Sequence, residues 1–455
     1  MIVDLTRTRR VHLVGVGGAG MSGIARMLLQ RGHEVSGTDL HGGRALEQLR
    51  VMGARVEVGH DADHLGDAEF VVVSTAVPAD NPELRSARSR DLPVLRRAEM
   101  LAALMDGSRS VLVAGSHGKT TTTSMTVVAL HAAGLDPSYA IGGALNETGT
   151  NAHAGTDELF VAEADESDRS FLVFEPSAVI ITNVEFDHPD EFGSHEDVAA
   201  AFMAFAARRR SGAPAIVCLD DPGAADLVER LADPVITYGQ DPRAELRLVV
   251  SDDGRARISR DDDQLIGFRV GAPGRHNLLN AVAALAVCEW AGVDLGAAAA
   301  GLERFTGAQR RFQRLGTARG IEVVDDYAHH PTELRATLEA ARSATDGRIV
   351  LVVQPHRYSR TRVLGEELGR AAAAAEVVVV TEVYASNEAP IPGVTGELVA
   401  EAARKAGAKV VWQPHLGSVV DELVEVVQQG DLVLVTGAGD VTQVGPALLE
   451  ALRRG

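Results

Sequence analysis

Apolar residues recur along the chain in short runs, separated by glycine, charged residues or amphipathic stretches. Because each run is apolar nearly throughout, the pattern predicts buried strands of parallel sheets whose two faces are covered by helices. The runs occupy residues 11–17, 69–75, 110–116, 158–165, 177–184, 213–219, 347–355, 376–383, 409–413 and 431–439. Their alternation with helical segments predicts an α/β fold, in which ligands bind at the carboxyl ends of strands.

Two changes of pattern divide the chain. Near residues 105–110 a polar stretch with glycine precedes a new apolar run, and near 307–316 another polar stretch follows an alanine-rich helical segment. We therefore expect three domains, at residues 1–106, 107–313 and 314–455. The length of 455 residues agrees with roughly three domains.

Composition and charge exclude several classes of protein. No stretch approaches about eighteen consecutive apolar residues, and the first residues lack the long apolar segment of a signal peptide. We therefore expect a cytoplasmic protein without membrane insertion. The net charge of −19 argues against nucleic-acid or anionic-membrane partners. Cys218 and Cys288 give neither a disulfide framework nor zinc-ligand spacing.

A glycine-rich turn follows the first predicted strand. Gly15, Gly17 and Gly20 have the G-x-G-x-x-G spacing, and Asp39 follows at the end of the segment HEVSGTD. Glycines let the backbone approach a phosphate closely, and the helix that follows offers free N–H groups. We interpret the turn as a nucleotide or nucleotide-sugar site. NAD stays open as the ligand, and a tight turn without a ligand is the structural alternative.

The stretch VLVAGSHGKTTTTS (111–124) is similar to a phosphate-binding loop but departs from its usual form. In a G-x-x-x-x-G-K-[ST] loop, the first glycine would stand where this chain has Val113. Gly118, Lys119 and Thr120 nevertheless follow a strand, where N–H groups and the lysine can bind phosphate and the hydroxyl can bind Mg²⁺. Four consecutive threonines are poor helix formers, so a capped helix start alone does not explain them.

Carboxylates gather at the ends of two predicted strands. The segment EADESD (163–168) closes one strand, and Glu185, Asp187 and His188 close the next. Acidic runs are usually solvated surface, but beside a phosphate loop they offer the oxygen ligands that Mg²⁺ prefers. We expect at least one metal ligand from each group, although histidine is a less usual ligand for Mg²⁺.

Three later segments also concentrate polar side chains. Asn277 and Asn280 begin a predicted helix at 274–285, where Asn277 could serve only as a helix cap. The segments DDYAHHPTE (325–333) and QPHRYSRTR (354–362) each follow a strand. In the second, Arg357 and Arg360 are three residues apart and can clamp a carboxylate or a phosphate.

These motifs, in this order, resemble the Mur ligase family over nearly the whole chain. The resemblance is carried by GVGGAGMSGIA, GSHGKTTTT, EADESDRSF, the segment 183–188, GRHNLLNA, RRF, DDYAHHPTE and QPHRYSRT. It implies an N-terminal Rossmann-like domain for a UDP-sugar, a central P-loop ATPase-like domain with a mostly parallel sheet, and a C-terminal Rossmann-like domain. The family's shorter phosphate loop reads G-T-x-G-K-T, so the missing glycine at Val113 is expected, and Ser116 replaces the threonine.

The resemblance also implies roles for individual residues. The expected ATP site comprises Gly115, Ser116, His117, Gly118, Lys119, Thr120, Thr121, His276, Asn277, Asn280, Arg310 and Asp325. The expected UDP-sugar site comprises Gly15, Gly17, Gly18, Gly20, Met21, Ser22, Asp39, Ser74, Thr75 and His117. The expected Mg²⁺ ligands are Thr120, Glu163 and His188. The expected amino-acid pocket comprises Tyr327, His329, Arg357 and Arg360. The expected catalytic residues are Lys119, His188 and Arg357.

The implied activity is the ATP-dependent joining of L-alanine to the lactyl carboxylate of UDP-N-acetylmuramate through an acyl phosphate, by a monomer or a homodimer. Several family members carry a carbamylated lysine in the central domain. No lysine lies between Lys119 and Lys405 here, which fits the alanine-adding branch. The alternatives are a related ligase that attaches a recycled tripeptide, a nicotinamide-dependent dehydrogenase, and a non-catalytic nucleotide-binding regulator, which the intact lysine and metal positions disfavour.

Overall fold

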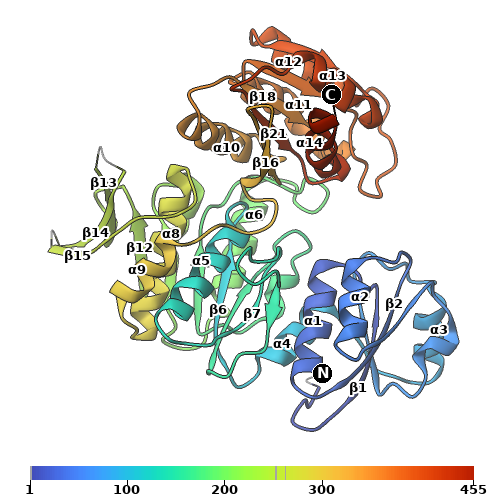
Figure 1. Ribbon diagram of the computed structural model, residues 1–455. Helices are drawn as coiled ribbons and strands as arrows, with labels where there is room; N and C mark the ends of the chain where they lie inside the picture. Colours follow the sequence, from blue (N-terminus) through green and yellow to red (C-terminus); the bar gives the residue numbers. More distant parts are fainter. Residues whose placement is uncertain (1–2, 252–253, 262, 455) are drawn as a thin grey trace.

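The computed structural model describes residues 3–251, 254–261 and 263–454, which form three α/β units (Figure 1). The N-terminal unit has a five-stranded parallel sheet of order β3-β2-β1-β4-β5. Its strands are β1 (Arg10–Val14), β2 (Glu34–Asp39), β3 (Arg55–Val58), β4 (Phe70–Val73) and β5 (Val94–Arg96). Its helices are α1 (Ala19–Gln30), α2 (Arg44–Val51), the 3₁₀ helix η1 (Ala62–Leu65), α3 (Pro82–Ser89) and α4 (Arg97–Met105).

The middle unit is built on a ten-stranded sheet of order β15-β14-β13-β12-β11-β10-β6-β9-β7-β8. Its strands are β6 (Arg109–Ala114), β7 (Ser138–Ala140), β8 (Ala152–His153), β9 (Leu159–Glu163), β10 (Ala178–Ile181), β11 (Ala215–Cys218), β12 (Val235–Gly239), β13 (Leu246–Val250), β14 (Ala256–Arg260) and β15 (Asp263–Phe268). Its helices are α5 (Lys119–Ala132), η2 (Ser170–Val173), α6 (His195–Ala206), α7 (Pro222–Val228), α8 (Arg275–Ala291) and α9 (Leu295–Glu303).

The C-terminal unit has a six-stranded sheet of order β16-β17-β21-β18-β19-β20, in which only the pair β16–β17 is antiparallel among the described strands. Its strands are β16 (Gln313–Ala318), β17 (Ile321–Asp326), β18 (Ile349–Val353), β19 (Val377–Val380), β20 (Lys409–Trp412) and β21 (Leu432–Thr436). Its helices are α10 (Pro331–Ala344), α11 (Tyr358–Ala372), α12 (Glu397–Lys405), η3 (Leu416–Ser418), α13 (Val419–Val426), η4 (Asp440–Gln443) and α14 (Val444–Arg454).

The ten predicted apolar runs each contain a strand that pairs in parallel with a neighbour, so the predicted α/β fold is confirmed. The expectation of parallel strands covered on both faces does not extend to the far edge of the middle sheet. There β13, β14 and β15 pair antiparallel. In β13 and β14 buried and exposed residues alternate, because one face meets solvent, and such strands lack a continuous apolar run.

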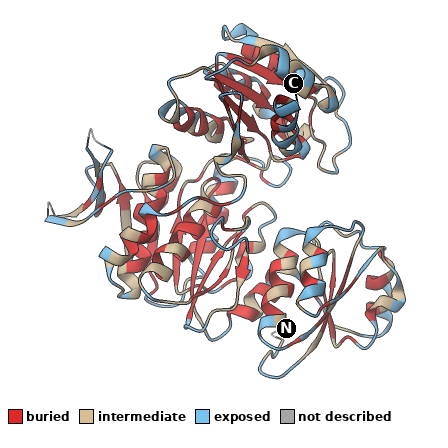
Figure 2. Ribbon diagram, in the orientation of Figure 1, coloured by how far each residue is buried: buried red, intermediate tan, exposed pale blue. Residues whose placement is uncertain are grey.

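The boundaries of the hydrophobic cores differ from those of the three sheets, although the central strands of each sheet are buried (Figure 2). One cluster joins N-terminal side chains such as Leu28 and Met105 to middle-unit side chains such as Phe160 and Phe202. Two other clusters, in the C-terminal unit, draw on that unit alone among the described residues. No helix in the described part of the chain is long and apolar enough to cross a membrane.

Candidate active site

The phosphate loop connects β6 to α5 at the carboxyl edge of the middle sheet. Gly115 has a φ of 148° and Gly118 a φ of 82°, conformations that favour glycine. A Cβ atom at Gly115 would lie 1.9 Å from Thr182 Oγ1. The Ser116 hydroxyl donates to the Glu185 carbonyl at 3.0 Å and accepts from the Glu185 N–H at 2.9 Å. The hydroxyl at position 116 therefore ties the phosphate loop to the segment after β10.

Lys119 opens α5 and presents a fixed positive charge beside this loop. Its Nζ donates to the carbonyls of Gly115 at 2.6 Å and Ser116 at 3.2 Å, and to Glu166 Oε1 at 2.9 Å. Burial would lower the pKa of Lys119, but the carboxylates of Glu166 and Asp165 raise it above its ordinary value. The ammonium group stays charged and suits phosphate oxygens. Glu166 belongs to the acidic run EADESD, but the sequence did not single it out as the partner of Lys119.

The three predicted Mg²⁺ ligands border one cavity with Lys119. Glu163, at the end of β9, accepts the Gly142 N–H at 2.8 Å, and burial raises the pKa of its carboxyl group. His188 has a φ of 56°, and its buried Nδ1 has no hydrogen-bond partner in the described part of the chain. The hydroxyl of Thr120 and the carboxylate of Glu163 are the oxygen donors that Mg²⁺ prefers, and a cation would offset the burial of Glu163. The residues present therefore fit a magnesium ion.

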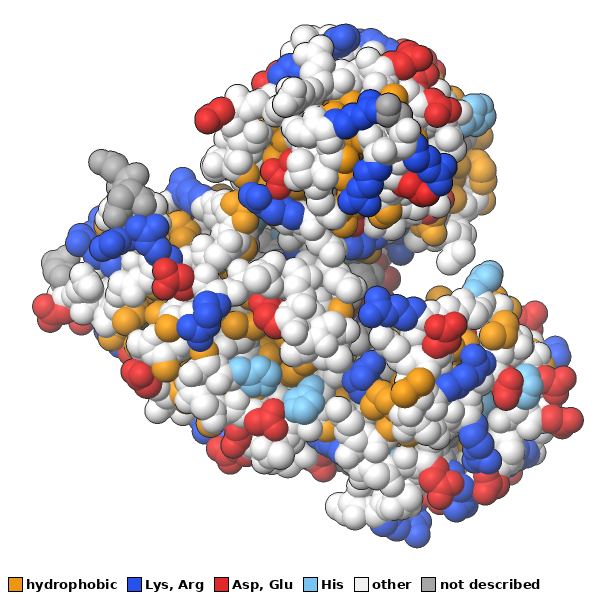
Figure 3. Space-filling model, viewed as in Figure 1, with side chains coloured by type: hydrophobic (Ala, Val, Ile, Leu, Met, Phe, Trp, Pro, Cys, Tyr) orange, Lys and Arg blue, Asp and Glu red, His pale blue; other side chains and the backbone are white. Residues whose placement is uncertain are grey.

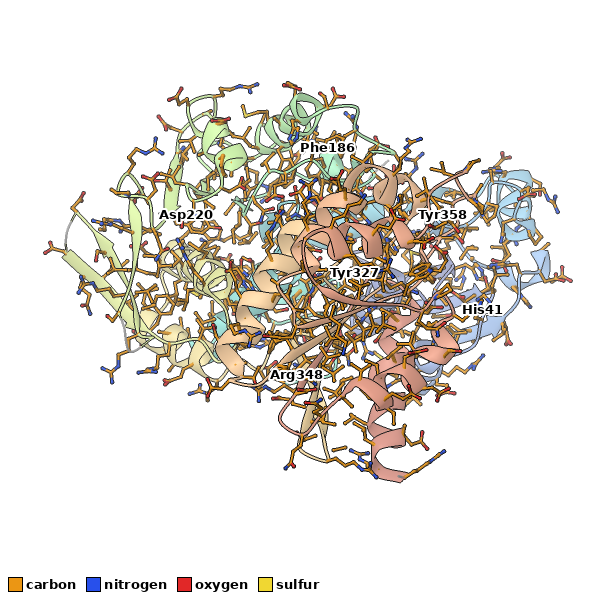
Figure 4. All side chains as sticks on the ribbon, turned by 90° about the horizontal axis from the view of Figure 1, so that it is seen from above. His41, Phe186, Asp220, Tyr327, Arg348 and Tyr358 are labelled. Carbon is orange, nitrogen blue, oxygen red and sulfur yellow. The ribbon has the colours of Figure 1, made fainter. Side chains whose placement is uncertain are left out.

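This cavity has a volume of about 890 Å³ and lies where the three units meet. In the space-filling view a hollow separates the C-terminal unit from the N-terminal unit, with arginine and lysine side chains along its edges (Figure 3). Tyr327 lies near the middle of the molecule when it is seen from above (Figure 4). The predicted site residues that line the cavity are Gly17, Ser22, Ser116, Lys119, Thr120, Glu163, His188, Arg310, Tyr327, His329, Arg357 and Arg360.

The glycine-rich turn reaches this cavity only in part. Gly17 and Ser22 line it, and the Gly17 N–H is donated to Asp39 Oδ2 at 2.9 Å. Met21 is 2% exposed and belongs to the hydrophobic core, so its side chain is turned away from any ligand. The predicted UDP-sugar residues outside the cavity wall are Gly15, Gly18, Gly20, Met21, Asp39, Ser74, Thr75 and His117.

A second, smaller cavity of about 160 Å³ lies between the middle and C-terminal units. Asn277 does not cap α8: its Nδ2 donates to the Pro273 carbonyl at 2.6 Å, and its Oδ1 accepts from Asn280 Nδ2 at 3.3 Å. Burial lowers the pKa of His276 to about 4, so its ring is neutral. The predicted ATP residues that line this cavity are His117, Gly118, Thr121, His276, Asn277 and Asn280.

Two residues predicted to bind ATP do not line the smaller cavity, whereas their neighbours in sequence do. Asp325 is paired with Arg310 at 3.3 Å, and Asp326 lines the smaller cavity. Arg311 borders both cavities, and its Nη2 donates to Thr120 Oγ1 at 3.3 Å. Successive residues of a strand point to opposite faces, so the pattern DD at the end of β17 could not show which aspartate faces this cavity.

The two arginines predicted to clamp a carboxylate already hold carboxylates of the middle unit. Arg360 Nε donates to Asp187 Oδ1 at 2.8 Å, and both side chains are almost fully buried. Arg357 Nη1 donates to Asp190 Oδ2 at 2.5 Å in a more exposed pair. Burial opposes the Asp187 charge, but Arg360 and nearby imidazoles hold its pKa well below the usual range. Arg357 therefore remains the more accessible of the two guanidinium groups.

Aromatic and imidazole groups complete the C-terminal wall of the larger cavity. The guanidinium carbons of Arg310 and Arg311 lie 4.9 and 5.0 Å from the centre of the Tyr327 ring. Burial lowers the pKa of His329 to about 4, although Glu333 opposes this shift. The imidazole of His329 is therefore neutral at pH 7.

Three α/β units, a phosphate loop and a cavity shared by all three units are the features of an ATP-dependent ligase. Family models match each of the three units. The model described as "Mur ligase family, catalytic domain" matches residues 10–109, the Mur ligase middle domain matches 113–288, and "Mur ligase, glutamate ligase domain" matches 310–439. The chain belongs to the Mur ligase family. This membership leaves the nicotinamide-dependent alternative for the glycine-rich turn without support.

Known relatives and a solved structure match nearly the full length of the chain. The chain is 50% identical to a UDP-N-acetylmuramate–L-alanine ligase of Acidothermus cellulolyticus, over 99% of this chain and 97% of that protein. It is 47% identical to the ligase of the same name from Thermobifida fusca, over 99% and 98%. The crystal structure of UDP-N-acetylmuramate–alanine ligase from Thermotoga maritima has a TM-score of 0.83 at 29% identity, covering 98% and 99% of the two chains.

Proposed function

We propose that the protein joins L-alanine to the lactyl carboxylate of UDP-N-acetylmuramate in an ATP-dependent reaction. One observation carries this proposal: the glycine-rich turn, the phosphate-loop lysine and the C-terminal arginine pair all border one cavity. A ligase that joins an amino acid to a nucleotide-sugar with ATP requires one site that all three substrates can reach. The names of the relatives, which match over nearly the full length of this chain, specify the same reaction.

The two cavities would bind different parts of the substrates. We propose that the loop 115–120 holds the ATP phosphates through its N–H groups and Lys119, with the adenosine in the smaller cavity beside Asn277 and Asn280. Asp326 and Arg311 are added to this site in place of Asp325 and Arg310. Thr120, Glu163 and His188 would hold Mg²⁺, which supplies neutralisation of phosphate charge.

The reaction needs positioning and charge neutralisation more than covalent help from the protein. The lactyl carboxylate attacks the γ-phosphate of ATP, which releases ADP and leaves an acyl phosphate. The amine of L-alanine then attacks the acyl carbon, and phosphate departs as the amide forms. Lys119 offsets the negative charge that would repel the attacking carboxylate, and Arg357 holds the alanine carboxylate. His329, which is neutral at the cavity wall, or solvent water can accept the amine proton.

We propose domain limits at 1–106, 107–312 and 313–455. The second limit moves by one residue from the predicted position, because β16 begins at Gln313. We propose a monomer or a homodimer, in which one chain contributes residues of all three units to the larger cavity. We also propose a cytoplasmic location, which suits nucleotide substrates, and the charge of −19 disfavours nucleic-acid partners.

Arg357→Ala is expected to raise the KM for L-alanine by at least about tenfold, because a charge-assisted hydrogen bond to a carboxylate contributes ~1.5–3 kcal/mol. Arg362→Ala is the matched control, since Arg362 is an exposed arginine on the same helix, α11. Initial rates over a range of alanine concentrations measure both values. Equal KM values for the two variants would remove Arg357 from the amino-acid pocket.

Asp326→Asn is expected to raise the KM for ATP by about tenfold or more, because Asp326 lines the smaller cavity and its carboxylate, which accepts from the Phe312 and Ala328 N–H groups, orders the backbone there. Asp325→Asn alters the adjacent carboxylate, whose partner is Arg310, and should change that KM by less than about threefold. Steady-state rates at varied ATP concentration compare the two. The reverse ranking would restore the original prediction from the sequence.

The direct test of the proposed function is phosphate release in the presence of ATP, Mg²⁺ and UDP-N-acetylmuramate. L-Alanine, glycine, L-serine and the tripeptide L-alanyl-D-glutamyl-diaminopimelate are added in separate reactions. We expect release with L-alanine to exceed that with the tripeptide by a wide margin. Faster release with the tripeptide would assign the chain to the peptide-recycling ligases instead.

A further inference from the structure

Two imidazoles and a carboxylate meet between the middle and C-terminal units, away from the predicted Mg²⁺ ligands. We call His117, Glu185 and His330 the interdomain cluster. His117 Nε2 lies 3.5 Å from Glu185 Oε2, and His330 Nδ1 lies 3.8 Å from the same oxygen. One donor atom from each of the three residues lies within 4.8 Å of the others. His117 belongs to the phosphate loop, and His330 is the residue that precedes α10.

The imidazoles of this cluster are buried and incompletely hydrogen-bonded. His117 is 9% exposed and His330 is 5% exposed. Nε2 of His330 has no hydrogen-bond partner among the described residues, and the two ring nitrogens of His117 have only the longer contacts to the carboxylates of Glu185 and Glu333. Buried polar groups whose contacts are this long favour a ligand that binds them more closely.

The charge of the surroundings favours a cation. Glu333 Oε1 lies 3.3 Å from His117 Nδ1, so two carboxylates face two imidazoles. In the absence of a metal ion, a proton on His117 can supply the missing positive charge: burial lowers the pKa of His117, but Glu333 and Glu185 together raise it to about 10. A divalent metal ion would replace that proton.

We propose that the interdomain cluster binds a zinc-like transition-metal ion. Two imidazoles and one carboxylate, with a fourth position left open, form a ligand set that proteins use for zinc. Metal–ligand bonds of about 2.0–2.2 Å require donor atoms roughly 3.3 Å apart in a tetrahedron. The two distances to Glu185 Oε2, 3.5 and 3.8 Å, are close to this value, and the two imidazoles, whose donor atoms lie within 4.8 Å of each other, would have to move closer together. His330 Nδ1 also accepts the Thr332 N–H at 3.3 Å, a long contact that the metal would replace.

The position of the cluster predicts what the ion would do. His117 and Glu185 come from the middle unit and His330 from the C-terminal unit, so the ion binds only when the two units are docked. His117 also lines the smaller cavity, next to the phosphate loop. A bound ion would therefore lock the two units in the docked arrangement, so that they could not separate between reaction cycles, and would fix His117 beside that cavity. We infer an inhibitory metal site, separate from the magnesium position formed by Thr120, Glu163 and His188.

Cobalt(II) titration tests the site without any turnover, because a tetrahedral cobalt ion with nitrogen ligands absorbs visible light. The full chain is titrated as wild type, as His330→Asn, which keeps a helix-capping side chain, and as Glu185→Gln, which keeps the side-chain shape. Glu163→Gln is the matched control at the magnesium position. We expect the absorption band in the wild type and in Glu163→Gln, and its loss in the other two variants.

Inhibition by zinc gives the second measurement. With Mg²⁺ in excess, the zinc concentration that halves the activity should rise at least tenfold in His330→Asn. Absence of the cobalt band in the wild type, its persistence in both cluster variants, or its loss in Glu163→Gln would each overturn the proposal. Equal zinc sensitivity of wild type and His330→Asn would overturn the inhibitory role. Neither the cobalt absorption nor the ratio of zinc sensitivities depends on which amino acid the enzyme uses.

Discussion

Lys119→Ala is expected to lower ADP formation by about 10²–10³-fold, the loss typical when a charged group that stabilises a transition state is removed. Lys119 Nζ is held by two loop carbonyls and Glu166, in the position where the loop would receive phosphate. The affinity for UDP-N-acetylmuramate should stay within about twofold, since the glycine-rich turn lies in another unit. A coupled assay measures ADP, and calorimetry measures binding of the UDP-sugar.

The control must separate catalysis from folding, because Lys119→Ala leaves Glu166 buried at 2% exposure without its partner. Removal of one partner of a buried pair destabilises a protein by ~3–5 kcal/mol. The double variant Lys119→Ala/Glu166→Gln restores neutrality and should recover much of the unfolding temperature, but not ADP formation. ADP formation near the wild-type rate in either variant would refute the assignment of the phosphate loop.

Asp187→Asn is expected to lower kcat/KM for L-alanine by about 100-fold. The carboxylate of Asp187 is paired at 2.8 Å with Arg360 across the boundary between two units, and both side chains are at most 5% exposed. Loss of its charge leaves the buried guanidinium unpaired, at a cost of ~3–5 kcal/mol that opposes docking of the C-terminal unit. Steady-state kinetics with alanine varied, at saturating ATP and UDP-sugar, measure the effect.

Asp190→Asn is the matched comparison, because Asp190 makes the same kind of pair with Arg357 but is 41% exposed. Exposed pairs contribute ~0.2–1 kcal/mol, so kcat/KM should fall by less than about fivefold. A separate thermal unfolding curve of each variant shows whether the fold is intact. Equal effects of the two substitutions would mean that burial of the Asp187 pair does not control docking.

The sequence predicted ten parallel strands correctly because these buried strands consist of continuous apolar runs. It missed the parallel strands that are short or contain polar residues, which are β2, β3, β5, β7 and β12. It also predicted which strand ends carry polar groups, and Lys119, Thr120, Glu163 and His188 do border one cavity. The antiparallel strands β13 to β15 were missed because one of their faces meets solvent. Their alternating pattern gives no continuous apolar signal.

Contacts between units could not be predicted from motifs. Asp187 and Arg360 are 173 positions apart, and nothing in either motif indicates that one neutralises the other. The same limit explains Glu166, which the sequence grouped with other carboxylates but which the fold turns toward Lys119. The neighbouring pairs Arg310–Arg311 and Asp325–Asp326 are harder still to predict. A family motif locates a segment, but only the backbone decides which of two identical neighbours lines the smaller cavity, where Arg311 and Asp326 lie.

The apolar cluster that joins the N-terminal and middle units has a thermodynamic consequence. Residues that share one core lose their packing together, so we expect these two units to unfold as one cooperative unit. The C-terminal unit has its own cores and contacts its neighbours through polar groups such as the Asp187–Arg360 pair. We therefore expect two unfolding transitions from three architectural units. A substitution that weakens the core of the N-terminal unit should also destabilise the strand and helix that carry the phosphate loop, while the C-terminal unit should stay folded.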